Sequence, residues 1–426
     1  MQEKMPDRSG EDPLGGRGTK PLAMRRVHEA MEEAIVEGVF PGAVLLVAFE
    51  GEVLFHRAYG QRQVLPQPLP MILDTRFDLA SLTKAVATSL AAMLLVQGGH
   101  LSLEDRIHPF LSVWGAARAG EAWTGITLRH LLSHSTGLPA WQPYYLEIEK
   151  RGWLGNPREA RRQAIRWIVE EPRLFPPGTR SLYSDLGFIL LGAWLEEVAG
   201  QTQDHFCQER IFRPLGLSHT GFRPLYWSLG HPPHRAQGSP SPTFSQVALR
   251  LGPPPGPSSP LFFAATEDCP WRKRILCGEV HDENAHALGG VAGHAGLFST
   301  AGEVYQLAET LRRAYRGEAG GPFIPQVVQT FFTRQVLGSP GGEVTEGSFA
   351  LGWDTPVPQG SSAGRHFSPR SVGHLGYTGT SLWMDLDRGL IVILLTNRVH
   401  PSRSNEAIKR FRPKIHDLIS LEVSGG

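Results

Sequence analysis

The sequence has few of the residues that would indicate a disulfide-stabilised, zinc-binding or membrane-spanning protein. Its three cysteines, Cys207, Cys269 and Cys277, are too few for a disulfide framework, although a Cys269–Cys277 pair stays open in an oxidising compartment. Their spacing is not that of a zinc site. The longest apolar runs, Ala43–Phe49 and Ala85–Val96, are too short or too polar to span a bilayer.

The first twenty residues lack the apolar segment and the small-residue cleavage site of a signal peptide. We therefore expect a cytoplasmic protein with no membrane span. The chain also has no excess of charge of either sign, since its 42 Lys and Arg residues are balanced by 41 Asp and Glu residues. Because the chain has no excess of basic residues, we do not expect it to bind nucleic acid. The 41% share of hydrophobic residues is that of an ordinary globular chain with a substantial core.

The most informative segment is Phe77–Lys84, which reads FDLASLTK and leads into an apolar, helix-like run. Ser81 and Lys84 stand three residues apart, so a helix would place both side chains on one face. A nearby lysine can assist the loss of the serine proton, and the start of a helix offers free N–H donors to an oxyanion. Alone the pattern is weak, because a helix that merely begins with a serine N-cap and carries a solvent-exposed lysine has the same Ser-x-x-Lys sequence.

Two later segments strengthen this interpretation. Pro176–Asp185 contains Tyr183 and leads into an apolar helix, and Gly373–Thr380 reads GHLGYTGT beside strand-like sequence. The order Ser-x-x-Lys, Tyr-x-Asp and His-x-Gly resembles the penicillin-recognising serine hydrolases, which include class C β-lactamases, D-Ala-D-Ala carboxypeptidases, family VIII esterases and D-aminopeptidases. Ile126–Pro139 and Gly293–Thr300 match as well. The resemblance extends from about Met24 to Leu421.

The hydrophobic patterns predict an α+β fold. A helix over Met24–Glu37 precedes a hairpin of Ala43–Phe49 and Val53–Ala58, and a second hairpin, Ser381–Asp385 with Leu390–Thr396, precedes a terminal helix. We expect the two hairpins to join in one antiparallel sheet flanked by helices. Further helices are expected over Ser81–Gln97, Arg158–Glu170, Leu186–Ala199 and Glu303–Tyr315, with Pro413 as the first residue of the last helix.

Because the three motifs span residues 81 to 379 and must meet in one site, we expect a single catalytic domain over residues 21–421. An all-helical subdomain at about 101–300 would be inserted between its sheet-forming ends. Residues 1–20 are expected to form a disordered tail. His231–Pro260 is rich in Pro, Ser and Gly and is expected to be an extended surface loop that could gate the site.

The resemblance implies roles for the matching residues. Ser81 would be the nucleophile, Lys84 its proton acceptor or electrostatic partner, and Tyr183 the group that passes the proton to the leaving group. The alternative for Tyr183 is a core tyrosine with a satisfied hydroxyl. The N–H groups of Ser81 and Tyr377 match the oxyanion hole, whose donors are typically worth ~10²–10³ in rate.

Two of the matching positions depart from the family pattern. Asp185 stands where asparagine is commoner; it would either hold Lys84 charged or cap the helix that starts at Leu186. His374 stands where many relatives carry lysine, so at neutral pH it would supply a substrate-binding cation only in part. Gly376 would let the substrate approach the strand backbone. Asp185, His374, Gly376 and Tyr377 are thus the predicted substrate-binding residues.

Two other patterns suggest different chemistry and are weaker. Gly360–Gly364 fits the Gly-x-Ser-x-Gly motif around Ser362, but the flanking prolines favour a loop over the strand and helix which that motif needs. His281, His286 and His294 suggest a metal, but the first two do not share a helix face and no second cluster supports them. More simply, Asp282 and His294 would order a wall of the site.

The sequence therefore predicts a serine hydrolase that forms an acyl-enzyme at Ser81 without metal or cofactor. Its substrate would be a small-molecule or short-peptide acyl compound. The resemblance favours a D-Ala-peptide carboxypeptidase or penicillin-binding-like peptidase. A carboxylesterase, a weak β-lactamase and a catalytically idle binder of peptidoglycan fragments are the alternatives.

Overall fold

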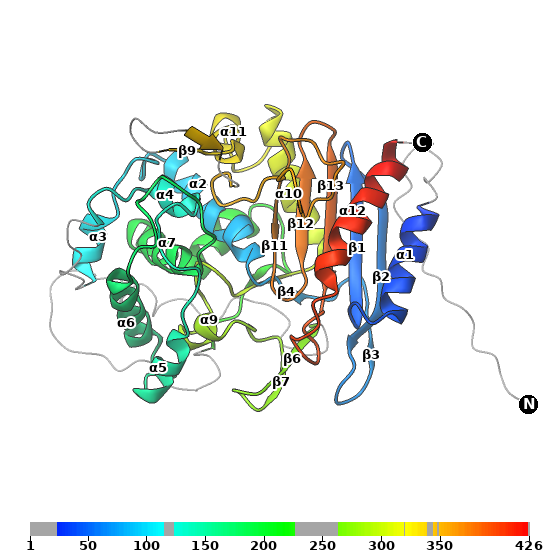
Figure 1. The fold of residues 1–426 in the computed structure, drawn as a ribbon, viewed down its shortest axis with the longest axis horizontal. Helices are drawn as coiled ribbons and strands as arrows, with labels where there is room; N and C mark the ends of the chain where they lie inside the picture. Colours follow the sequence, from blue (N-terminus) through cyan, green and yellow to red (C-terminus); the bar gives the residue numbers. More distant parts are fainter. Residues whose placement is uncertain are drawn as a thin grey trace, which may run out of the picture.

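A six-stranded antiparallel sheet organises the right half of the molecule in Figure 1. The computed structural model describes residues 24–114, 123–225, 263–318, 320–338, 344–346 and 349–424. The strand order is β11-β12-β13-β1-β2-β3. The strands are β11 (Val372–Leu375), β12 (Ser381–Asp385), β13 (Leu390–Thr396), β1 (Gly42–Phe49), β2 (Glu52–Gln63) and β3 (Leu69–Pro70). The expected tail 1–20 and the loop 231–260 lie outside the described residues.

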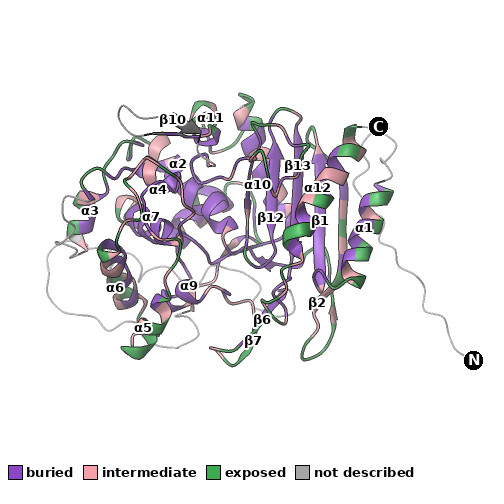
Figure 2. Cartoon of the chain, in the orientation of Figure 1, coloured by how far each residue is buried: buried purple, intermediate pink, exposed green. Residues whose placement is uncertain are grey.

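The central strands are apolar throughout because both faces of the sheet are covered. In β1, Val44, Leu46 and Ala48 belong to one hydrophobic core, whereas Ala43, Leu45 and Val47 belong to another. The side chains of β13 alternate in the same way, and its register with β1 runs from Ala43 opposite Thr396 to Phe49 opposite Leu390. Figure 2 shows these strands as buried, apart from Phe49 at the end of β1, which is partly exposed.

Helices α1 (Arg25–Val36) and α12 (Ile408–Ser424) cover one face of the sheet. Phe411 of α12 meets Phe40 edge to face at 5.4 Å. The other face packs against α10 (Ala301–Tyr315) and the larger core, to which α11 (Pro325–Phe332) also contributes. The expectation of an α+β fold with both terminal hairpins in one antiparallel sheet is confirmed.

The rest of the described chain is mostly helical and gathers beside the sheet, at the left of Figure 1. The helix that follows Ser81 continues into α2 (Ser89–Gln97), and α7 packs against α2, α4 and α6. The other helices are α3 (His108–Val113), α4 (Leu128–Leu132), α5 (Tyr144–Lys150), α6 (Pro157–Glu170), α7 (Asp185–Ala199), α8 (Gln203–Cys207), the π-helix Gln208–Phe212 and α9 (Glu283–Ala287). The boundary of a separate helical subdomain stays a prediction.

Small sheets join the two halves. A three-stranded sheet has the order β4-β8-β5, with β4 (Phe77–Asp78) ending just before Ser81. The other pairs are two-stranded hairpins. The bounds are β8 (Leu297–Ser299), β5 (Gly221–Phe222), β6 (Ala265–Cys269), β7 (Arg274–Cys277), β9 (Val336–Gly338) and β10 (Val344–Glu346).

Two expectations about local structure need correction, and the structure also bears on the Cys269–Cys277 pair that the sequence left open. Pro413 lies inside α12, which begins five residues earlier; burial of Ile408 and Phe411 outweighs the one helical hydrogen bond that proline cannot donate. The expected helix over Ser81–Gln97 begins with a π-helical turn over Lys84–Thr88. Cys269 and Cys277 are free thiols, since the hairpin pairs Cys269 with Arg274 and Cys277 with Ala265.

Within the part of the chain that the structure describes, no helix combines the length and the apolar character needed to cross a bilayer.

Candidate active site

Ser81 is held in place by the short segment that links β4 to the first helical turn. Ala80 has a positive φ of 46°, a conformation that non-glycine residues rarely adopt. The buried Asp78 carboxylate holds this bend, because it accepts the N–H of Ala80 at 2.8 Å and the N–H of His281 at 2.6 Å. A strained backbone next to a candidate nucleophile is typical of functional sites.

Lys84 is fully buried, and its ammonium group has three acceptors. Its Nζ lies 3.0 Å from Ser81 Oγ, 2.6 Å from Asp185 Oδ1 and 3.1 Å from the carbonyl oxygen of His294. These three contacts match the three N–H bonds of a charged lysine. A charged Lys84 would donate to Ser81 in this arrangement, which is the contact expected of an electrostatic partner of the serine.

Tyr183 completes the group around the serine. Its side chain hydrogen-bonds that of Ser81, and the centroid of its ring lies 4.8 Å from Lys84 Nζ. Burial, together with the negative charge of Asp185, raises the pKa of the Tyr183 hydroxyl well above its usual value. The resting group is therefore a neutral phenol, which can accept one proton while it releases another.

Asp185 does not cap α7, which was one of the two roles that the sequence left open for it. The N-cap of α7 is Ser184, whose Oγ accepts the N–H of Gly187 at 3.3 Å, and Asp185 lies in the first turn. The Asp185 N–H donates to the carbonyl of Ala140 at 2.8 Å. Its carboxylate is thus free to bind Lys84, which agrees with the alternative that Asp185 holds the lysine charged.

The turn after β11 lies against the segment that precedes Ser81. Thr378 Oγ1 donates to the carbonyl of Asp78 at 2.7 Å, and Thr380 Oγ1 donates to that of Leu79 at 3.0 Å. A Cβ on Gly376 would come within 2.5 Å of the Leu79 carbonyl oxygen, so this approach requires glycine. Among the described residues, no acceptor binds the backbone N–H of Ser81 or Tyr377. Both donors are available to an oxyanion.

His374 is not the partial cation that the sequence suggests. Burial, together with the charge of Lys84, lowers the pKa of its imidazole to about 3. Its Nδ1 lies 2.8 Å from the carbonyl oxygen of Leu375, so Nδ1 carries the proton and donates it. At neutral pH the ring is uncharged, and its Nε2 is an acceptor.

Sequence reasoning missed Asp354, which pairs with the outer edge of β11. Its N–H donates to the carbonyl of Gly373 at 2.8 Å and its carbonyl accepts the N–H of Gly373 at 3.0 Å. Burial raises the pKa of the Asp354 carboxyl to about 7, although the positive charges of Lys84 and Arg412 oppose the shift. Nothing in the sequence Leu351–Thr355 signals a site; only the pairing with β11 brings this carboxyl to it.

The raised pKa of Asp354 predicts a pH-dependent gain in stability when Asp354 is replaced by Asn. The folded chain holds this proton more tightly than the unfolded chain, where the pKa is near its ordinary value of 3.8. The carboxyl therefore destabilises the fold increasingly as the pH rises from about 4 to 7 and stays destabilising above that. We expect Asp354→Asn to raise the free energy of unfolding by up to ~4 kcal/mol above pH 8.

The measurement is denaturant unfolding of wild type and Asp354→Asn at several pH values. Below pH 4 both forms carry an uncharged group at this position, so the two curves should nearly coincide. A destabilising effect that is equal at all pH values would contradict the predicted burial of the charge. Asp387→Asn, in the exposed turn between β12 and β13, is the matched control and should show no such trend.

The opposite wall of the site is held by a buried pair. His294 Nε2 lies 2.8 Å from Asp282 Oδ1, and the same oxygen accepts the N–H of Ala285 at the start of α9. The His294 proton and its charge hold the pKa of Asp282 below its usual range. The pair fixes the segment whose carbonyl binds Lys84, as the sequence suggested.

The two weaker patterns do not form sites. In the described ranges, no group of three or more His, Cys, Asp or Glu side chains is placed to hold a metal ion. His281 instead pairs with Glu267 at 3.2 Å. Ser362 lies in a turn without a strand before it or a helix after it, and its carbonyl accepts Nδ1–H of His416 at 2.7 Å.

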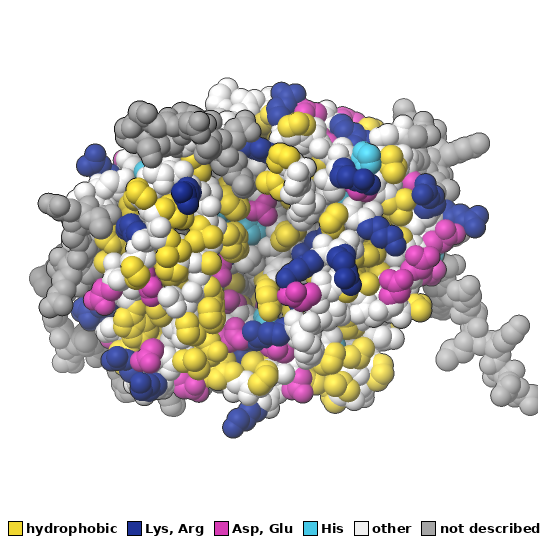
Figure 3. Space-filling model, viewed as in Figure 1, with side chains coloured by type: hydrophobic (Ala, Val, Ile, Leu, Met, Phe, Trp, Pro, Cys, Tyr) yellow, Lys and Arg dark blue, Asp and Glu magenta, His cyan; other side chains and the backbone are white. Residues whose placement is uncertain are grey.

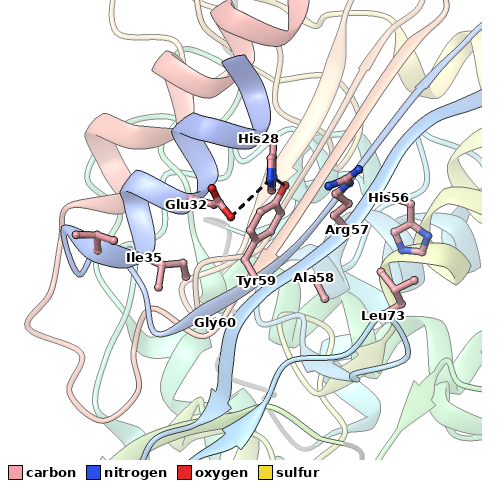
Figure 4. A pocket seen from close by; sticks show the side chains of 10 residues that line it. His28, Glu32, Ile35, His56, Arg57, Ala58, Tyr59, Gly60 and Leu73 are labelled. Atoms are coloured by element: carbon pink, nitrogen blue, oxygen red, sulfur yellow. Dashed lines mark hydrogen bonds and ion pairs between the residues drawn. The ribbon is translucent and has the colours of Figure 1, made fainter. Parts of the chain in front are cut away.

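The molecular surface is hollowed between the helices and the sheet. Figure 3 shows this hollow near the middle of the face, with histidine and acidic side chains on its walls. A separate groove of about 670 Å³ lies between α1 and β2, where His28 meets Glu32 and Tyr59 (Figure 4). That groove contains none of the residues around Ser81 and forms no part of the candidate site.

Comparison with known proteins gives consistent matches over nearly the whole chain. The sequence model of the family described as Beta-lactamase matches residues 25–415. An N-acetylmuramyl-L-alanine amidase of Bacillus subtilis (strain 168) is 32% identical over 394 residues, which are 88% of this chain and 81% of the relative. A protein of Escherichia coli (strain K12), named as a D-alanyl-D-alanine carboxypeptidase, is 31% identical over 372 residues, 85% of this chain and 79% of the relative.

Solved structures share the fold. EstCE1, described as a hydrolase with promiscuous acyltransferase activity, superposes with a TM-score of 0.65 at 24% identity. The match covers 93% of this chain and 98% of EstCE1.

Proposed function

The chain belongs to the beta-lactamase family and is a serine hydrolase of that superfamily, and on this basis we propose that it works through an acyl-enzyme at Ser81. One observation carries the assignment. Ser81 Oγ contacts both the Lys84 ammonium and the Tyr183 hydroxyl, next to two unbound N–H donors. A nucleophile, a charge that stabilises its alkoxide, a proton relay and an oxyanion hole are the parts that acyl transfer requires.

In the proposed acylation, Ser81 Oγ attacks the substrate carbonyl carbon and its proton moves to the Tyr183 oxygen. The Tyr183 proton passes to the leaving nitrogen or oxygen as the carbonyl bond to that atom breaks. The N–H groups of Ser81 and Tyr377 hold the oxyanion between these events. Lys84 stays charged throughout and lowers the energy of the Ser81 alkoxide. Water then repeats the sequence in reverse and releases the acid.

We propose a short peptide or related acyl compound as the substrate, within one catalytic unit at residues 21–421. The name of the Escherichia coli relative supports a D-Ala-containing peptide, and that of the Bacillus subtilis relative supports an N-acetylmuramyl-L-alanine amide. A carboxylesterase is the second candidate, and a specific observation favours it. The uncharged His374 supplies no cation for the terminal carboxylate that a carboxypeptidase must bind. The cytoplasmic location stays a prediction, which cell fractionation would test.

The test is the intact mass of the protein after incubation with benzylpenicillin, for wild type and Ser81→Ala. We expect a single covalent adduct on wild type and none on the variant, because the β-lactam carbonyl would acylate Ser81. If wild type shows no adduct, hydrolysis of p-nitrophenyl acetate decides between an esterase and an idle binder. An adduct that persists in Ser81→Ala would contradict the assignment of the nucleophile.

A further inference from the structure

Tyr183 lies in an irregular segment that ends at Ser184, the N-cap of α7. Its hydroxyl stands at the end of a long side chain, so a small change in the backbone would carry this oxygen away from Ser81. A proton relay works only while donor and acceptor stay within hydrogen-bond distance of each other. The proposed reaction therefore requires contacts that hold Tyr183 in place.

His134, just after α4, holds the backbone on both sides of Tyr183. Its carbonyl oxygen accepts the N–H of Leu182 at 2.8 Å, and its Nδ1 accepts the N–H of Ser184 at 3.1 Å. Burial, together with the charge of Lys84, lowers the pKa of the His134 imidazole well below its usual value. The ring is therefore neutral and carries its proton on Nε2, which leaves Nδ1 as the acceptor.

The imidazole of His134 also packs against the ring of Tyr183. The two ring centroids lie 4.7 Å apart, with an angle of 34° between the planes. The rings of Phe188 in α7 and of Phe349 contact the same imidazole at centroid distances of 4.9 Å and 4.8 Å. Because α4 lies beside α7 (Figure 1), the imidazole is enclosed and cannot move away from the tyrosine without disrupting close packing.

The backbone conformation at His134 is one that favours glycine. Helix α4 ends in a Schellman motif, in which the N–H of Ser135 donates to the carbonyl of His130 at 2.9 Å and that of His134 donates to the carbonyl of Leu131 at 3.3 Å. His134 occupies the left-handed position of this motif, with a φ of 55°. Glycine adopts this conformation without strain, so a histidine here indicates that its side chain supplies contacts which glycine lacks.

Resting on the proposed function, we propose that His134 is a positioning residue that fixes Tyr183 as the proton relay of Ser81. The carbonyl and Nδ1 of His134 hold the backbone on either side of the tyrosine, and its ring limits the movement of the phenol. The Tyr183 oxygen thereby stays within reach of Ser81 and of the leaving group. His134 contacts no substrate atom in this role, and its effect on the rate passes through Tyr183.

The test compares p-nitrophenyl acetate with phenyl acetate, which share one acyl group and differ in how much the leaving group needs a proton. p-Nitrophenolate leaves readily as an anion, whereas the more basic phenolate benefits from protonation by Tyr183. The readout is kcat/KM, since it reports the acylation step and not the deacylation that both esters share. We expect His134→Gly to lower kcat/KM roughly hundredfold for phenyl acetate and roughly tenfold for p-nitrophenyl acetate.

Three further variants sharpen the test. His134→Asn is the conservative change, since its Oδ1 can accept the Ser184 N–H and asparagine tolerates a positive φ; it should shift the ratio of the two rates less than His134→Gly. His416→Ala is the matched control, because it also truncates a buried histidine whose Nδ1 bonds a backbone carbonyl, in α12. It should lower the thermal midpoint and leave the ratio unchanged. Tyr183→Phe gives the ratio expected when the relay is lost entirely.

Two outcomes would overturn the proposal. The first is a wild-type ratio in folded His134→Gly, or in His134→Asn if the glycine variant does not fold, because His134 would then be a core residue only. The second is a further change in the ratio when His134→Gly is added to Tyr183→Phe. A residue that acts through the Tyr183 hydroxyl has no effect on the ratio once that hydroxyl is gone.

The failure of this positioning role and that of the proposed function are distinguishable. If hydrolysis of both esters requires Ser81 but the ratio does not respond to His134, only the positioning role is wrong. If hydrolysis does not depend on Ser81 at all, the proposed function fails, and the role of His134 fails with it.

Discussion

Ser81→Ala is expected to lower kcat/KM for any substrate of this enzyme by roughly 10⁴- to 10⁶-fold, since loss of a nucleophile removes the covalent route altogether. The fold should be unaffected. Ser81 accepts a hydrogen bond from Lys84, but that lysine keeps two other acceptors after the substitution. The measurement is steady-state hydrolysis of p-nitrophenyl acetate, with the thermal midpoint as a check on folding.

The matched control is Ser362→Ala, which alters the serine of the Gly-x-Ser-x-Gly sequence. Because Ser362 lies in a turn remote from the candidate site, this variant should keep the activity of wild type. The reverse pattern, in which Ser362→Ala is inactive and Ser81→Ala is active, would mean that the catalytic assignment is wrong.

Lys84→Met is expected to reduce both activity and stability. Methionine has nearly the length of lysine but no charge, so the Ser81 alkoxide loses its electrostatic partner and kcat should fall by roughly 10³-fold. The substitution also leaves the Asp185 carboxylate, whose side chain is 16% exposed, without its ion-pair partner. Removing one member of a buried pair typically costs about 3–5 kcal/mol, and partial solvation of Asp185 places the expected loss below that range.

The double variant Lys84→Met/Asp185→Asn separates the two effects. With both charges gone, no unpaired carboxylate remains, so unfolding in urea should show recovery of part of the lost stability. Activity should stay low, because the alkoxide still has no cation beside it. Recovery of activity along with stability would show that Lys84 has a purely structural role.

Much of the fold could be predicted because it follows from local patterns. The two hairpins are marked by apolar runs around short polar turns, and the apolar character of β1 and β13 indicates a sheet covered on both faces. Pro413 shows the limit of such rules. Its preference for a first helical turn is a local effect, and the packing of Ile408 and Phe411, which no local pattern reveals, decides where the helix begins.

The candidate site was predicted to the extent that it depends on sequence spacing. Ser81 and Lys84 are near neighbours, and Tyr183 follows them in the motif order of the penicillin-recognising serine hydrolases, so the resemblance to that family selected them. The hydrogen bonds and the solvation of each side chain were not predictable, because they depend on burial and on partners far away in the sequence. The lysine is saturated by Asp185 and the His294 carbonyl, His374 is desolvated, and Asp354 reaches the site through a backbone bridge to Gly373.

The position of β1 in the sheet has a consequence for biosynthesis. This apolar strand is made long before its partner β13, which begins only at Leu390. While the ribosome synthesises the intervening residues, one edge of the β1–β2 hairpin stays unpaired, and such an edge readily joins other chains. We therefore expect the sheet to close only after β13 has left the ribosome, and a holding chaperone to raise the yield of native protein.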